Sequence, residues 1–199
     1  MSGKKYKETS SKVDRTKQFN VDEALGLLES IPTAKFDETV DLAVRLGIDP
    51  KQSDQMVRGS TPLPHGLGKK VRIVVIAKGD KQEEAEKAGA TVVGSDELIE
   101  KIEKGWLDFD KVVTTPDMMK SVSRLAKLLG PRGLMPNPKM GTVTFDVGAV
   151  VRELKAGRAE YRIEKAGIVH CSIGKLSFGK QKLKENLLTL MDSIIRAKP

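Results

Sequence analysis

The chain has 199 residues, of which 39% are hydrophobic and 31% charged, and this composition places it among soluble globular proteins. Lysine and arginine total 35 against 27 aspartates and glutamates, and the resulting formal charge of +8 favours a polyanionic partner. The single cysteine, Cys171, excludes an internal disulfide framework and a multi-cysteine metal site, and the lack of a secretory signal or a bilayer-long apolar run predicts a cytoplasmic protein.

The N-terminal third predicts one helix and two strands. We expect the tail, residues 1–18, to lack regular structure because lysine, serine and threonine dominate it. Asn20 is a favourable N-cap for a helix over 21–30, and Glu23 completes the pattern of a capping box. Alternating apolar and polar residues then predict half-buried strands. One is expected over 39–46, and a shorter one near 56–62.

The middle of the chain alternates strands with helices. Residues 71–77 are almost continuously apolar, which is typical of a strand buried on both faces. Such alternation requires crossover connections and therefore predicts a mainly parallel sheet. The turn after this strand, Lys78-Gly79-Asp80, lacks the glycine patterns that bind pyrophosphate, so we expect a Rossmann-like scaffold without a cofactor. The later elements are expected at 81–88, 91–93, 95–104, 112–114, 116–129 and 147–154.

The C-terminal part returns to the mixed pattern of the first third. Alternating residues at 159–164 and 168–173, on either side of the turn at Ala166 and Gly167, predict a β-hairpin. An amphipathic helix is expected at about 181–197. The two ends of the chain therefore resemble each other more than either resembles the middle.

This pattern predicts a mixed α/β and α+β protein in which one domain is inserted into another. We expect a split α+β domain, residues 1–67 plus 157–199, and an inserted Rossmann-like α/β domain, residues 68–156. Residues 1–70 and 156–199 together carry 21 basic and 14 acidic residues, a net charge of +7, whereas residues 71–155 are +1. The polyanion should therefore bind the split domain.

Side chains suited to catalysis or metal binding are scarce. His65 lies in the turn 63–66 and His170 on a predicted strand, and neither has a nucleophile or carboxylate motif beside it. Cys171 is expected to be a small buried residue. We therefore expect no enzyme activity, metal or cofactor. The alternative to a nucleic-acid-binding protein is a ligand-binding α/β regulatory module, which the glycine-poor turn at 78–80 disfavours.

The most unusual segment is 130–141, with three glycines and three prolines in twelve residues. Proline fixes φ and glycine permits positive φ, so the segment should follow one fixed path. It is either a rigid structural loop or a surface that presents backbone N–H groups, Arg132 and Lys139 to phosphates.

Cations and one aromatic ring stand at strand ends, with Lys35 and Phe36 before one strand and Gly174 and Lys175 after another. Phe36 is either a core plug or a flat surface for a ribose or base. With one tryptophan, two tyrosines and five phenylalanines, the chain has too few aromatic residues for a stacking platform. We therefore expect contacts to the backbone, 2′-hydroxyls and shape of a structured RNA.

Several segments together resemble one known family. They are residues 33–39 (TAKFDET), 53–55 (SDQ) with 57–59 (VRG), 63–66 (LPHG) and 129–139 (LGPRGLMPNPK). The last segment is highly specific. The chain resembles the L1 family of bacterial large-subunit ribosomal proteins over essentially its whole length.

The resemblance implies a function as well as the inserted-domain fold. Proteins of this family bind large-subunit rRNA through the split domain and form the mobile stalk beside the tRNA exit site. They assist the release of deacylated tRNA and repress translation of their own operon by binding its mRNA. The implied partners are these three RNAs, with no membrane and no small-molecule substrate. The residues implied for RNA contact are Lys35, Phe36, Glu38, Thr39, Arg58, His170, Gly174 and Lys175.

The sequence departs from the family pattern at two places. Met56 stands where the family usually has asparagine, which removes a polar side chain from that position. The family also continues past the last helix into a strand whose Thr-Met-Gly segment contacts RNA, whereas this sequence ends at Pro199. We therefore expect this sequence to bind RNA more weakly than one that includes the strand.

Overall fold

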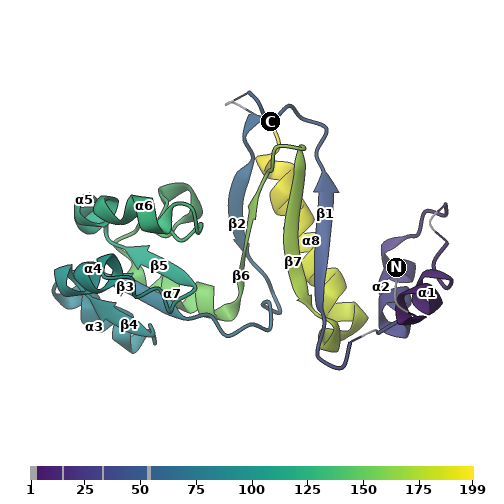
Figure 1. Cartoon of the computed structure of the whole chain (residues 1–199), viewed down its shortest axis with the longest axis horizontal. Helices are drawn as coiled ribbons and strands as arrows, with labels where there is room; N and C mark the ends of the chain where they lie inside the picture. Colours follow the sequence, from purple (N-terminus) through teal and green to yellow (C-terminus); the bar gives the residue numbers. More distant parts are fainter. Residues whose placement is uncertain (1–3, 15, 33, 53–54) are drawn as a thin grey trace. The chain divides into compact units, whose positions relative to one another are not determined.

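A computed structural model describes residues 4–14, 16–32, 34–52 and 55–199 of the chain (Figure 1). The chain divides into two compact units. The first consists of Met1–Val57, Leu63–Gly68 and Tyr161–Pro199, and the second of Arg58–Pro62 and Lys69–Glu160. The second unit thus includes 58–62, a segment that the sequence pattern grouped with the chain ends.

The first unit is an α+β arrangement built around one long helix and a two-stranded antiparallel sheet. Strand β1 (Thr39–Arg45) pairs with β7 (Ile168–Lys175). The helices are α1 (Lys4–Ser10), α2 (Val21–Ser30), the 3₁₀ turn η5 (Leu176–Phe178) and α8 (Gly179–Ala197). The predicted capping box of α2 is confirmed, because Asn20 accepts a hydrogen bond from the backbone of Glu23 and the Glu23 side chain accepts one from the backbone of Asn20.

One face of this small sheet is buried and the other is exposed. On β1 the buried residue Val40 alternates with exposed Thr39 and Asp41, as the half-buried strand predicted. Helix α8 packs on β7, and the side chains that it buries are Leu183, Asn186, Leu190 and Ile194. The face that carries Thr39 and Asp41 is therefore the exposed side of the sheet.

Two predictions about the chain ends were wrong. The tail contains α1, because lysine and glutamate favour helix and the backbone N–H of Ser11 closes the last turn on Lys7. The predicted hairpin does not form a ladder, since only one isolated bridge joins Ile163 to Val169. Strand β7 pairs instead with β1. Buried and exposed residues alternate along β1 as they do along most of β7, so the two strands bury the same face of the sheet.

The second unit contains a three-stranded parallel sheet in the order β4-β3-β5, which confirms the predicted strand–helix alternation. The strands are β3 (Ile73–Ile76), β4 (Val92–Gly94) and β5 (Lys111–Thr114). The main helices are α3 (Asp80–Lys87), α4 (Asp96–Glu103) and α7 (Val147–Ala156). A separate pair of strands is β2 (Arg58–Pro62) and β6 (Arg158–Arg162), of which Tyr161 and Arg162 belong to the first unit.

The helix predicted at 116–129 is divided into short pieces. They are η2 (Pro116–Met118), α5 (Met119–Val122), η3 (Ser123–Leu125) and α6 (Ala126–Leu129). The hydroxyl of Ser123 donates to the carbonyl oxygen of Met119, 2.7 Å away, and such a side-chain bond competes with regular helical pairing. A 3₁₀ turn, η4 (Pro138–Met140), follows in the glycine- and proline-rich segment.

The core of the second unit lies on both faces of β3. Val74 and Ile76 belong to one buried cluster, whereas Ile73 and Val75 belong to another. Successive residues of a strand point to opposite faces, so this strand is buried on both sides as predicted. Within the part of the chain that the structure describes, no helix has the length and apolarity needed to cross a membrane.

Candidate nucleic-acid interface

The exposed aromatic ring of Phe36 marks the end of the β1–β7 sheet. Phe36 is 75% exposed, so its interpretation as a core plug is wrong. Neighbouring Lys35 is also exposed. A large apolar ring that makes so little contact with its own protein is available to stack on a ligand.

Lys175 lies opposite Thr39 at the same sheet end. Its ammonium group donates to the hydroxyl of Thr39 at 2.8 Å and to the carbonyl oxygen of Asp37 at 3.3 Å. One residue further on, the backbone N–H of Leu176 donates to the carbonyl oxygen of Glu38 at 2.8 Å. The Glu38 carboxylate in turn accepts a bond from the backbone N–H of Ala34 at 2.9 Å. These bonds bring the predicted contacts of both chain ends together.

Gly174 is required for this close packing. It pairs with Val40 beside a register shift in the sheet, and its φ of +147° is disfavoured for other residues. A β-carbon at this position would lie 2.9 Å from the ring of Phe178 and 3.1 Å from a methyl of Leu183. Gly174 therefore lets η5 and α8 approach the strand rather than offering a side chain to a partner.

An open depression of about 470 Å³ adjoins the ring of Phe36. Its lining residues are Glu29, Pro32, Phe36, Asp37, Glu38, Leu176, Ser177 and Gly179. Three of these are carboxylates, which repel phosphate groups. The depression therefore suits a ribose or a base better than a phosphate.

His170 lies elsewhere on the same sheet. It is exposed, pairs with Ala43, and has Nε2 3.2 Å from a carboxylate oxygen of Glu164. Five residues of extended strand separate it from Lys175, which corresponds to about 17 Å. The structure thus places His170 on the exposed face of the sheet but not within the cluster around Phe36.

Arg58 belongs to the second unit, as do Arg132 and Lys139. The guanidinium Nε of Arg58 lies 2.9 Å from the sulfur of Met140. Arg132 and Lys139 are both exposed. The predicted contacts are therefore divided between the two units, with six of the eight primary residues on one sheet end, His170 further along that sheet, and Arg58 in the other unit.

The segment 130–141 is held by its own hydrogen bonds. The backbone N–H of Lys139 donates to the side chain of Asn137, and the backbone N–H of Asn137 donates to the hydroxyl of Thr142, both at 2.8 Å. The N–H of Leu134 donates to the carbonyl oxygen of Leu129 at 3.0 Å. Because these backbone N–H groups donate within the protein, the segment is a rigid loop. The groups of the segment that can contact a phosphate are the exposed side chains of Arg132 and Lys139.

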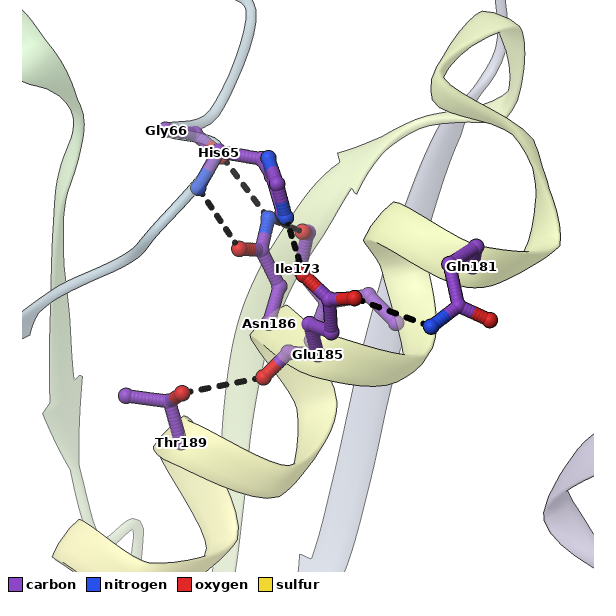
Figure 2. Close-up of polar contacts among 7 residues, drawn as sticks. All are labelled: His65, Gly66, Ile173, Gln181, Glu185, Asn186 and Thr189. Atoms are coloured by element: carbon purple, nitrogen blue, oxygen red, sulfur yellow. Dashed lines mark hydrogen bonds and ion pairs between the residues drawn. The ribbon is translucent and has the colours of Figure 1, made fainter.

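A second polar network anchors the loop 63–66 to α8 and β7 (Figure 2). The side chain of Asn186 is fully buried; it accepts a bond from the backbone N–H of His65 at 3.1 Å and donates to the carbonyl oxygens of Gly66 and Ile173 at 3.0 and 2.8 Å. His65 Nε2 also lies 2.5 Å from a carboxylate oxygen of Glu185. His65 therefore has a structural role.

The contact with His65 holds the pKa of Glu185 below its usual value, and a bond from Gln181 adds to this effect. A carboxylate whose pKa is lower in the folded state stabilises the fold above its unfolded pKa. This contribution is lost as the pH falls through the lowered pKa. The His65–Glu185 contact therefore favours the folded state at neutral pH.

Sequence reasoning missed Asp37, Ser177 and Asn186. Asp37 lies between two predicted contacts, so its position was visible, but its partner Ser177 is 140 residues away and no local pattern connects the two. Asn186 could have been noticed as the polar residue on the apolar face of a predicted amphipathic helix. The described residues contain no group of three or more histidine, cysteine, aspartate or glutamate side chains that could hold a metal ion.

Comparison with known proteins gives a family match and a similar relative. The model of the family described as "Ribosomal protein L1p/L10e family" matches residues 27–199. The chain is 58% identical over 199 residues to the large ribosomal subunit protein uL1 of Bdellovibrio bacteriovorus. That alignment covers 100% of this chain and 85% of the relative.

Proposed function

This chain belongs to the ribosomal protein L1p/L10e family, and we propose that it binds large-subunit rRNA through the sheet end around Phe36. As a member of this family it is a ribosome-associated structural protein of the large subunit and not an enzyme. The observation that carries the proposal is the 75% exposed ring of Phe36, beside the cationic side chains of Lys35 and Lys175 at the ends of two paired strands.

The arrangement suits a folded RNA. An exposed ring offers a stacking surface for a base or ribose, and lysine ammonium groups neutralise phosphates. The contacts proposed at the sheet end are Lys35, Phe36, Glu38, Thr39, Gly174 and Lys175. His170, on the exposed face of the same sheet, is proposed as a further contact. Arg58, with Arg132 and Lys139 as secondary contacts, is proposed to reach RNA from the second unit, which we propose to be the inserted Rossmann-like domain.

We further propose that the chain acts in the mobile stalk at the tRNA exit site, assists release of deacylated tRNA and represses its own operon. The support is family membership, and a surface that binds rRNA would also fit an rRNA-like element in the mRNA.

RNA recovered with the protein from cells should identify these partners. Sequencing of RNA crosslinked to the chain and purified with it should recover one segment of large-subunit rRNA as the dominant species, with tRNA and the leader of the operon's mRNA as minor species. A protein that recovers no enriched rRNA segment contradicts the main proposal. Recovery of rRNA without the mRNA leader would contradict only the proposed repression of the operon. Recovery of rRNA without tRNA would contradict only the proposed role in tRNA release.

Replacing Phe36 with alanine should weaken rRNA binding and leave stability almost unchanged. Loss of a stacking ring costs about 1–3 kcal/mol of binding, whereas loss of a core ring would cost about 3–5 kcal/mol of stability. Because Phe36 is 75% exposed, only the first effect is expected. The measurements are rRNA affinity and melting temperature.

Lys104→Ala is the control for this substitution. Lys104 is an exposed cation at the C-terminal end of α4, in the second unit, so its removal should change affinity less than removal of the Phe36 ring. A Phe36→Ala protein that binds rRNA as well as Lys104→Ala would contradict the contact proposed for Phe36.

A further inference from the structure

Both carboxylate oxygens of Asp37 accept hydrogen bonds from Ser177. The backbone N–H of Ser177 donates to Oδ1 of Asp37 at 3.1 Å, and the Ser177 hydroxyl donates to Oδ2 at 2.7 Å. The bond from the hydroxyl, followed by that from the backbone, holds the pKa of Asp37 below its usual value. Asp37 is therefore an ionised acceptor whose oxygens are occupied within the protein.

Further bonds fasten the same two segments together. The carbonyl oxygen of Asp37 accepts from Lys175, and that of Glu38 accepts from the backbone of Leu176. The two residues that follow Phe36 are thus tied to the end of β7 and the start of η5. The Phe36 ring is 75% exposed and makes little contact with the protein, so the backbone at Asp37 must set its direction.

We propose that Asp37 and Ser177 are positioning residues for the RNA surface: their bidentate contact fixes the ring of Phe36 and the ammonium group of Lys175 in place before RNA binds. The inference rests on the proposed function of this sheet end. Ordering a loop in advance strengthens binding because its conformational entropy is not lost during association. It also accounts for a carboxylate next to a surface for a polyanion, since this carboxylate serves the protein rather than the RNA.

The test compares this pair with a second aspartate–serine pair on the same strands. The hydroxyl of Ser172, on β7, donates to Oδ1 of Asp41, on β1, at 2.6 Å. Asp37→Ala and Asp41→Ala remove the same charge, and that loss alone should slightly strengthen RNA binding. Ser177→Ala and Ser172→Ala are the corresponding variants without a charge change. Affinity is measured in the whole 199-residue chain for the rRNA segment recovered with it from cells.

Asp37→Ala should weaken binding about fivefold and Ser177→Ala about threefold, as expected from about 0.5–1.5 kcal/mol for ordering a contact group. The Asp41 and Ser172 variants should stay within about twofold of the wild type. Asp37→Asn should retain most of the affinity, because its amide can accept from the Ser177 N–H and donate to its hydroxyl. Ser177→Ala and Asp37→Asn decide the question if Asp37→Ala fails to fold.

A double-mutant cycle with Phe36→Ala separates positioning from direct contact. If Asp37 acts by holding Phe36 in place, adding Asp37→Ala to Phe36→Ala should weaken binding less than it does in the wild type. Fully additive losses, or equal effects of Asp37→Ala and Asp41→Ala, would overturn the inference. If Phe36→Ala itself has no effect, the proposed RNA surface is at fault rather than the role of Asp37.

Discussion

Asn186→Ala should lower the free energy of unfolding of the first unit by about 3 kcal/mol. The Asn186 side chain is fully buried, and its amide satisfies one backbone N–H and two backbone carbonyl oxygens. A buried polar group left without a partner costs about 1–3 kcal/mol. Alanine leaves all three groups unsatisfied, and partial relaxation of the loop 63–66 should recover some of the loss. Urea unfolding of the whole 199-residue chain measures this effect.

Thr189→Ala is a matched control on the same helix. The Thr189 hydroxyl donates to the carbonyl oxygen of Glu185 at 2.9 Å, one turn earlier, and the residue is half-buried (Figure 2). Because Glu185 lies inside α8, its carbonyl oxygen also belongs to the backbone hydrogen-bond pattern of the helix. Removal of the hydroxyl should therefore lower the free energy of unfolding by less than about 1 kcal/mol. If Asn186→Ala destabilised the protein no more than Thr189→Ala, the proposed importance of this network for the fold would be wrong.

The sequence predicts those elements whose cause is local. The capping box at Asn20 and the doubly buried strand β3 follow from residues within a few positions of each other, and both are confirmed. The hairpin prediction was wrong because the turn at Gly167 brings the ends of two strands together but does not determine which strand each one pairs with along its length. Which strand β7 pairs with is decided by β1, more than a hundred residues earlier.

The same limit applies to the candidate site. The positions of Phe36 and Lys175 at strand ends were predictable, because the strands themselves are marked by alternation. Whether the Phe36 ring is buried was not predictable, since burial depends on what packs above it. The bidentate contact between Asp37 and Ser177 also lies beyond sequence reasoning, because it exists only after β1 and β7 have paired.

A fragment containing only residues 68–157 should fold by itself. Both buried clusters of the second unit, and the partly buried residues packed against them, lie within 71–154. The parallel sheet β4-β3-β5 is likewise complete within this range. The fragment lacks β2, and with it the contact of Arg58 with Met140, so the segment 130–141 should be looser than in the whole chain. Cooperative thermal unfolding of the fragment measures whether the core is intact.

The same fragment should lose rRNA binding almost completely, with an affinity at least about a thousandfold below that of the 199-residue chain. It lacks the whole sheet end around Phe36, and its net charge is +3 against +8 for the whole chain, so the stacking ring is absent and phosphate neutralisation is weaker. Arg132 and Lys139 remain in the fragment, so any residual binding reports their contribution. Titration of the rRNA segment with the folded fragment and with the 199-residue chain gives the comparison. A folded fragment that kept most of the affinity would move the RNA site to the second unit and refute the assignment to Phe36 and its neighbours.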